Sequence, residues 1–150
     1  MSKAAFDYLI PDWPAPANVS AAITLRARGT SLSPYDHFNL ATHVGDNPAQ
    51  VATNRSLLRK QLALTLEPMW LDQVHGTEVI YAPNNPSLPS ADGTYTDIVN
   101  LPCAILTADC MPVLLCNQQG TQVAAVHAGW RGLCGGFISK ALEQFASGDN

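Results

Sequence analysis

Three side chains that commonly bind transition metals each lie at the end of a short apolar segment. His75 closes WLDQVHG, Cys110 closes AILTADC, and His127 follows VAAV in VAAVHAGW. Metal ligands gather at strand ends, where rigid elements lead into loops. Two imidazoles and one thiolate suit zinc, and three protein ligands leave the fourth tetrahedral position open for water or substrate. Zinc also lowers the pKa of bound water and of a coordinating thiol, so such a site supplies a nucleophile at neutral pH.

Spacing alone leaves a plainer alternative open, in which the two histidines bond to backbone groups and the cysteine is a buried hydrophobe. The chain has four cysteines, at positions 103, 110, 116 and 134, and no pair has CxxC spacing. A zinc ribbon and a thioredoxin motif are therefore excluded. In a chain of this size a metal or catalytic role is expected for one cysteine, and burial for Cys103, Cys116 and Cys134.

The elements that must position these residues alternate between strand and helix patterns. Apolar alternation or short apolar runs predict strands at 21–28, 69–74, 78–81, 105–108, 113–116 and 123–126, and helical spacing predicts helices at 48–65 and 132–146. The first helix has a clear start, because Asp46 or Asn47 can cap it and Pro48 suits its first turn. This alternation predicts an α/β fold, a layered sandwich with a mixed sheet.

Composition excludes several classes of protein. The 150 residues fit one domain, and only 13% are charged, against a usual value of about 25%. The net charge is -4 and no Lys/Arg cluster occurs, so nucleic acid is not an expected partner. No apolar run reaches the roughly 18 residues that span a bilayer, so no membrane partner is expected either. The first residues lack the apolar stretch of a signal peptide, which predicts a cytoplasmic protein.

Polar residues near the three candidate ligands could take part in catalysis or substrate binding. Asp109 precedes Cys110 and could act as an acid or base, or cap backbone N–H groups. Arg131, in GWRG, suits a phosphate or oxyanion, or is a surface arginine near a helix start. Gln73 shares a strand face with His75 and could contact substrate or orient the site.

Two further motifs contain candidate contacts. FNLATHVGD holds Asn39 and His43, of which the histidine could carry a proton or contact substrate, or simply pack in its loop. Asp92, in ADG, is a candidate contact, although Asp-Gly is first of all a turn signal. Trp70 and Trp130 are expected in the core rather than stacked on a base.

Five motifs occur in one order: FNLATHVGDNP, WLDQVHGTEV, ADGTYTD, AILTADCMPVLL and AAVHAGWRGL. Together they resemble the laccase-domain purine nucleoside phosphorylase family (YfiH-like), whose members are also called multicopper polyphenol oxidases. The resemblance implies zinc ligands at His75, Cys110 and His127, and a metal-binding domain over 19–150 after an irregular, proline-rich lead-in over 1–18. It implies phosphorolysis of adenosine, inosine and methylthioadenosine, with adenosine deamination at the same site, so the expected partners are a purine nucleoside and phosphate.

The chain departs from the family pattern in two loops and at its C-terminus. Thr30 follows Gly29 where the family usually has a second glycine, and residues 37–41 read HFNLA where the family usually has Ser-Leu-Asn-Leu-Gly. Family members usually continue into a Gly-Pro-x-Ile-Gly stretch and further strands. The fold is therefore expected to lack its C-terminal third.

Three other functions stay open. Copper binds such nitrogen and sulfur sites more tightly than zinc, so a Cu²⁺-dependent polyphenol oxidase is an alternative. Multicopper oxidases, however, use many histidines, commonly in HxH pairs, whereas this chain has four histidines and no HxH. A zinc amidase that edits a cell-wall precursor and a non-enzymatic metal-binding protein are the remaining alternatives. Monomer and homodimer are both compatible with the sequence.

Overall fold

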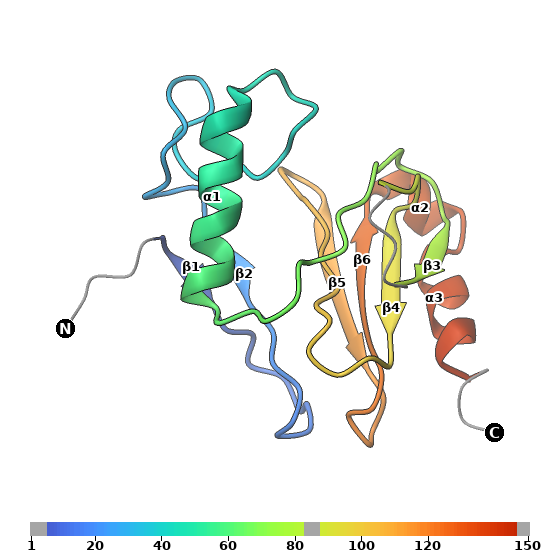
Figure 1. Ribbon diagram of the computed structural model, residues 1–150. Helices are drawn as coiled ribbons and strands as arrows, with labels where there is room; N and C mark the ends of the chain where they lie inside the picture. Colours follow the sequence, from blue (N-terminus) through green and yellow to red (C-terminus); the bar gives the residue numbers. More distant parts are fainter. Residues whose placement is uncertain (1–5, 83–87, 147–150) are drawn as a thin grey trace. The chain divides into compact units, whose positions relative to one another are not determined.

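The computed structural model describes residues 6–82 and 88–146 (Figure 1). Its contacts divide the chain into two compact units. Unit 1 comprises Met1–Trp13 and Ser20–Thr65, and unit 2 comprises Pro14–Val19 and Leu66–Asn150. All three candidate metal ligands belong to unit 2.

Unit 1 is built from one helix, one pair of short strands and long loops. Strand β1 (Tyr8–Leu9) pairs antiparallel with β2 (Ile23–Thr24). Helix α1 (Pro48–Gln61) begins where the sequence predicts, because the Asn47 side chain accepts a hydrogen bond from the N–H of Ala49 at 2.9 Å. It ends four residues before the predicted position 65, and Ala63 already has a left-handed φ of 51°.

The strand predicted over 21–28 is much shorter than expected. Only Ile23–Thr24 is a strand, because the carbonyl of Arg26 accepts hydrogen bonds from the N–H groups of His37 and Phe38 instead of joining a ladder. The buried Phe6 ring stacks on Phe38 at a centroid distance of 4.2 Å. This stacking anchors the start of the described chain in the core of unit 1.

Asn54 of α1 holds the loop that follows β2. Its fully buried side chain accepts hydrogen bonds from the N–H and the hydroxyl of Thr30, at 2.9 and 3.0 Å. Its amide nitrogen donates to Ser31 Oγ at 3.0 Å and to the carbonyls of His37 and Asn39 at 3.2 and 2.9 Å. One side chain therefore contacts five polar partners along this loop, with its two amide hydrogens shared among three acceptors.

Asp46 extends the same network. Its Oδ2 accepts from the Asn39 amide at 2.9 Å and from the Ser31 hydroxyl at 2.7 Å, and its Oδ1 accepts from the N–H of Asn47. These hydrogen bonds, those from Asn39 and Ser31 above all, hold the pKa of Asp46 below its ordinary value of 3.8.

Unit 2 contains a four-stranded mixed sheet, which confirms the predicted fold class. Its strands are β3 (Val79–Tyr81), β4 (Gly93–Thr96), β5 (Met111–Cys116) and β6 (Val123–Ala128), in the order β3-β4-β6-β5. The β3–β4 pair is parallel and the other two pairs are antiparallel. Helices α2 (Trp130–Cys134) and α3 (Phe137–Ala146) follow β6 (Figure 1).

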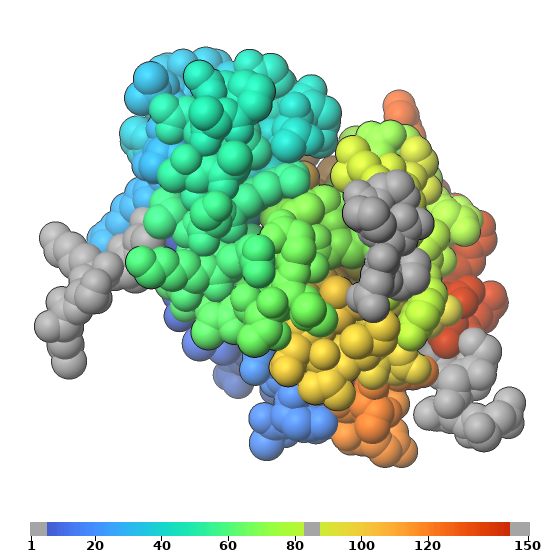
Figure 2. Space-filling model, viewed as in Figure 1, coloured from blue at the N-terminus to red at the C-terminus, as the bar shows by residue number. Residues whose placement is uncertain are grey.

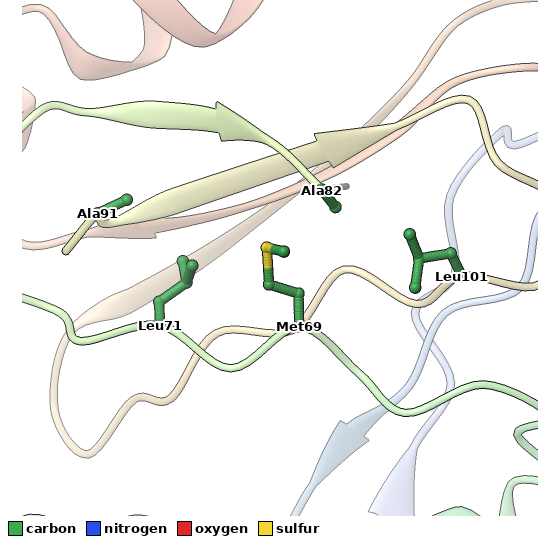
Figure 3. Close-up of a cluster of buried hydrophobic side chains, with 5 residues drawn as sticks. All are labelled: Met69, Leu71, Ala82, Ala91 and Leu101. Carbon is green, nitrogen blue, oxygen red and sulfur yellow. The ribbon is translucent and has the colours of Figure 1, made fainter. Parts of the chain in front are cut away.

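The two faces of this sheet are covered differently. Phe137 and Ala141 of α3 pack with Val126, and partly buried Val79 joins this cluster. The next residue, Ile80, belongs to the other cluster, so the two clusters lie on opposite faces. That second cluster consists of Met69, Leu71, Ala82, Ala91 and Leu101, all of them from segments outside the strands (Figure 3).

Two predicted strands are absent, at 69–74 and 105–108. Instead the chain makes two isolated bridges, Met69 to Cys103 and Asp72 to Ser90. In the space-filling view the segments near residues 66–72 and 98–103 lie side by side (Figure 2). Their apolar residues cover the sheet, but no neighbouring strand offers them a continuous ladder. In these two segments the apolar pattern therefore indicates burial of the side chains, but it does not indicate that the segments pair as strands.

The sequence pattern did not predict the central strand β4, and the helix that it predicted near the C-terminus is divided into α2 and α3. β4 reads Gly-Thr-Tyr-Thr, without an apolar run, although Thr94 and Thr96 are buried in the sheet. The helix expected over 132–146 is interrupted by Gly135 and Gly136, the latter with a left-handed φ of 75°. A Cβ on Gly135 would come within 2.8 Å of Thr77 Cγ2, so a side chain there would clash.

Candidate metal centre

The structure brings His75, Cys110 and His127 together, with their ligand atoms all within 4.8 Å of one another. His127 lies at the end of β6, as predicted. Cys110 directly precedes β5 rather than ending a strand, and His75 lies in a turn before β3. The prediction that all three close strands is therefore wrong for two of them. Cys110 nevertheless reaches the site, because β5 pairs with β6 and places Pro112 opposite His127.

Exposure decreases in order across the three residues. His75 is exposed, Cys110 is half-buried and His127 is buried. The rings of His75 and His127 meet edge to face, with centroids 4.8 Å apart and planes at 78°. An ion bound by these side chains would thus be buried on the side of His127 and would face solvent on the side of His75.

Asp92 connects the two histidines. Its Oδ1 accepts a hydrogen bond from His127 Nδ1 and another from the backbone N–H of His75, both at 2.9 Å. Its Oδ2 accepts from the N–H groups of Gly76 at 2.7 Å and Val74 at 3.2 Å. The carboxylate is fully buried. Burial raises its pKa, but the hydrogen bond from His127 and those from the three N–H groups outweigh that effect and hold the pKa below 3.8.

Gly129 makes room for the thiol. A Cβ at this position would lie 3.3 Å from Cys110 Sγ and 3.6 Å from Cδ2 of His75. The backbone of Gly129 has ordinary dihedral angles, so it is the space beside the sulfur, and not conformation, that favours glycine here.

The donor set fits a metal ion such as zinc. Because an ionised carboxylate can only accept, His127 Nδ1 must donate to Asp92, which leaves Nε2 with its lone pair free for a metal. Two imidazoles and one thiolate complete three of four tetrahedral positions. Among the described residues, this is the group of potential ligands that meets the distance requirement for a metal site.

The other predicted residues of unit 2 take different places. Gln73 is committed to the backbone: its Nε2 donates to the Leu106 carbonyl at 2.8 Å, and its Oε1 accepts from the Leu106 N–H at 2.6 Å. It thereby holds the segment that leads to Cys110. Asp109 is exposed and forms no hydrogen bond or ion pair with the described part of the chain.

Arg131 is exposed, and its guanidinium carbon lies 5.3 Å from the centroid of the Trp130 ring. Trp130 itself is 71% exposed, so the expectation that it belongs to the core is wrong. It opens the short helix α2 at the surface, and a flat side chain there is accessible to a ligand. Cys134, at the end of α2, is also exposed, contrary to the expected burial.

Asn39 and His43 belong to unit 1, whereas the three candidate metal ligands belong to unit 2. The Asn39 amide donates to Asp46 and to the Ala41 carbonyl, and its Oδ1 accepts from the Ala41 N–H. Its polar atoms are thus engaged within the loop. His43 is exposed and forms no hydrogen bond or ion pair with other described residues.

Sequence reasoning missed Gly129 and did not anticipate how Asp92 acts. A glycine two residues after a potential ligand, in HAGW, was the available signal for close approach to the metal site. For Asp92 the Asp-Gly pair pointed to a turn, and only the contact with a histidine 35 positions later shows its place at the site.

The comparisons with known proteins assign the chain to a family. Residues 20–150 match the family described as multi-copper polyphenol oxidoreductase laccase, and the chain belongs to this family. Two similar proteins are named purine nucleoside phosphorylase: YfiH of Escherichia coli (strain K12) and a Haemophilus influenzae protein, both 46% identical. The matches cover 92% and 90% of this chain but only 57% and 55% of those proteins.

Solved structures show the same relation. The chain superposes on Neisseria meningitidis protein NMB0706 with a TM-score of 0.86 and 46% identity, covering 91% of this chain and 56% of that one. YlmD from Geobacillus stearothermophilus gives a TM-score of 0.81 at 31% identity. The chain thus spans little more than half the length of the proteins it matches. Within the described residues, no helix is both long and apolar enough to cross a membrane.

Proposed function

We propose that this chain carries the metal site of a zinc-dependent purine nucleoside phosphorylase that acts on adenosine, inosine and methylthioadenosine. The same site would deaminate adenosine. The observation that carries the proposal is the cluster of His75, Cys110 and His127 with one side open to solvent. The names of the E. coli and H. influenzae relatives support the reaction class.

The chemistry requires little from the chain beyond positioning. In phosphorolysis a phosphate oxygen bonds to C1′ of the ribose while the bond from C1′ to N9 breaks, and the leaving purine takes up a proton. A zinc ion at this site would supply Lewis-acid stabilisation of developing negative charge. His75, Cys110 and His127 would hold the ion. The exposed guanidinium of Arg131 suits a phosphate, and the exposed carboxylate of Asp109 suits proton transfer.

Metal analysis and turnover of the same preparation test this proposal. The chain is produced without added copper, its metals are measured by mass spectrometry, and adenosine and inosine are supplied with and without phosphate. We expect about one zinc per chain, and release of base and ribose 1-phosphate that requires phosphate. Base release that is independent of phosphate, or a zinc-loaded chain that consumes neither nucleoside, would overturn the phosphorylase proposal. Inosine and ammonia formed from adenosine would support the deaminase.

A pair of cysteine variants separates the metal site from general effects of substitution. Cys110→Ala removes one of three ligands and should abolish most zinc binding and turnover. Cys134→Ala, at an exposed position outside the cluster, should retain both. Equal zinc content in the two variants would show that the cluster is not the metal site.

Copper-dependent phenol oxidation is the second candidate, because the family name states it and the donor set also accepts copper. The described residues hold one cluster of potential ligands, whereas multicopper oxidation needs several copper ions. Oxygen uptake with a phenol and copper-loaded protein is the direct test, and we expect none above that of free copper.

A further inference from the structure

We propose that Asp92 is a positioning residue that assembles the metal site before any ion binds, by fixing both histidine ligands from one buried carboxylate. The proposal rests on the proposed metal site but not on the proposed reaction. Asp92 lies just before β4 at the centre of the sheet. Its side chain is fully buried, so it does not contact substrate in solution.

Asp92 holds His127 at two points. The backbone N–H of His127 donates to the Asp92 carbonyl at 2.7 Å, and the His127 ring donates from Nδ1 to Asp92 Oδ1 at 2.9 Å. The first bond fixes the place of the residue in the sheet. The second fixes the ring orientation and the tautomer, so that Nε2 is the available ligand atom.

Asp92 holds His75 through its backbone. Three successive N–H groups, those of Val74, His75 and Gly76, converge on the two carboxylate oxygens at 2.7 to 3.2 Å. His75 has a φ of 60°, in the left-handed region that is costly for a residue with a side chain. The carboxylate stabilises this conformation, because the three N–H groups converge on its oxygens only while the turn is kept. The conformation in turn presents the His75 ring to that of His127.

These contacts account for all four strong acceptor directions of the carboxylate. Two donors meet each oxygen, and the partners come from the turn before β3 and from β6. A substrate or metal contact by Asp92 would have to break one of these bonds. Its function is therefore to join the two histidine ligands rather than to bind the ion itself.

The first test uses the unmodified protein without metal. Histidine labelled with ¹⁵N is read by NMR, and two-bond couplings identify the tautomer of each of the four rings. We expect Nδ1 of His127 to carry a proton in its hydrogen bond to Asp92. The tautomer protonated at Nε2 alone should not be observed. A metal-free His127 protonated only at Nε2 would overturn the proposal, and this result does not depend on whether any variant folds.

The second test compares Asp92→Asn with a matched control, Asp97→Asn. Asp97 also accepts a short hydrogen bond, from the Tyr81 hydroxyl at 2.6 Å. It is exposed, and it directly follows the end of β4 that lies away from Asp92. Titration with Co²⁺ reports binding through its visible bands and through the thiolate charge-transfer band. We expect Asp92→Asn to bind about 10- to 100-fold more weakly, with altered bands and an altered His127 tautomer, and the control to match the unmodified protein.

A purely structural Asp92 would give another pattern. The variant would then lose stability while its folded fraction bound Co²⁺ with unchanged affinity and spectrum, and this outcome would overturn the proposal. Absence of phosphorolysis, by contrast, would leave both tests standing, because neither measures turnover. The inference on Asp92 and the proposed reaction can thus fail separately.

Discussion

Replacing Asn54 by aspartate should destabilise unit 1, although the new side chain has nearly the same shape as the old one. The substitution keeps the side-chain volume and keeps an acceptor for both groups of Thr30. It replaces the amide nitrogen, which donates to Ser31 Oγ and to the carbonyls of His37 and Asn39, by an oxygen that can only accept when ionised. Ser31 cannot reverse its role easily, since its hydroxyl already donates to Asp46.

The magnitude follows from these lost donors. The two amide hydrogens that serve three acceptors disappear, each hydrogen bond being worth about 0.5–1.5 kcal/mol net, and a buried charge then faces acceptors without partners, at a cost of about 1–3 kcal/mol per unsatisfied group. Some relaxation or water entry will recover part of this loss. We therefore expect a destabilisation of about 3–5 kcal/mol, which corresponds to a fall in Tm of about 10 °C for a chain of this length.

Thermal unfolding and hydrogen exchange give the assay. Asn54→Asp should lower Tm as stated and accelerate amide exchange over residues 30–39 and in α1, with little change in the sheet of unit 2, because all of the partners of Asn54 lie in unit 1. Asn47→Asp is the matched control. It makes the same chemical change at an exposed helix cap, where aspartate and asparagine serve equally well.

A loss below about 1 kcal/mol for Asn54→Asp, or an equal loss in the control, would refute this reasoning. The first result would mean that the loop reorients around the new carboxylate. The second would mean that added negative charge, and not the lost donors, causes the effect. Exchange that accelerates equally in both units would contradict the assignment of the network to unit 1.

Three further predictions concern single positions. Gly129→Ala should weaken Co²⁺ binding about tenfold in titration, since the new Cβ would lie 3.3 Å from Cys110 Sγ, and unchanged affinity would show that the thiol moves freely. Burial raises the pKa of Cys103 to about 12, so at pH 8 iodoacetamide should modify the exposed Cys134 and spare Cys103, as read by peptide mass spectrometry. The pKa of Asp46 is lowered in the folded state, so its contribution to stability is complete above the unfolded value of about 3.9 and is lost as pH falls through the folded value. Between about pH 2 and pH 6, the melting temperature of Asp46→Asn should therefore depend less on pH than that of the unmodified chain. An equal dependence in the two proteins would contradict this sign.

Local signals in the sequence were sufficient for several elements. Asn47 and Pro48 predicted the start of α1, because capping needs only residues within the first turn. The apolar runs at 113–116 and 123–126 predicted β5 and β6, which pair directly across a short turn. The mixed α/β class followed from the same alternation, and ligand chemistry singled out His75, Cys110 and His127 without any structure.

The sequence by itself thus determined the class of fold and the start of α1, and it supplied the candidate metal ligands as a prediction. Only the tertiary structure decided which apolar segments pair, because ladder hydrogen bonds depend on a neighbour that the local pattern does not contain: 69–74 packs on the sheet as coil, whereas the polar β4 lies within it. It also decided that Trp130 faces solvent and that Asp92 joins two histidines. Burial and side-chain pairing arise between residues far apart in the chain, so no local pattern could report them.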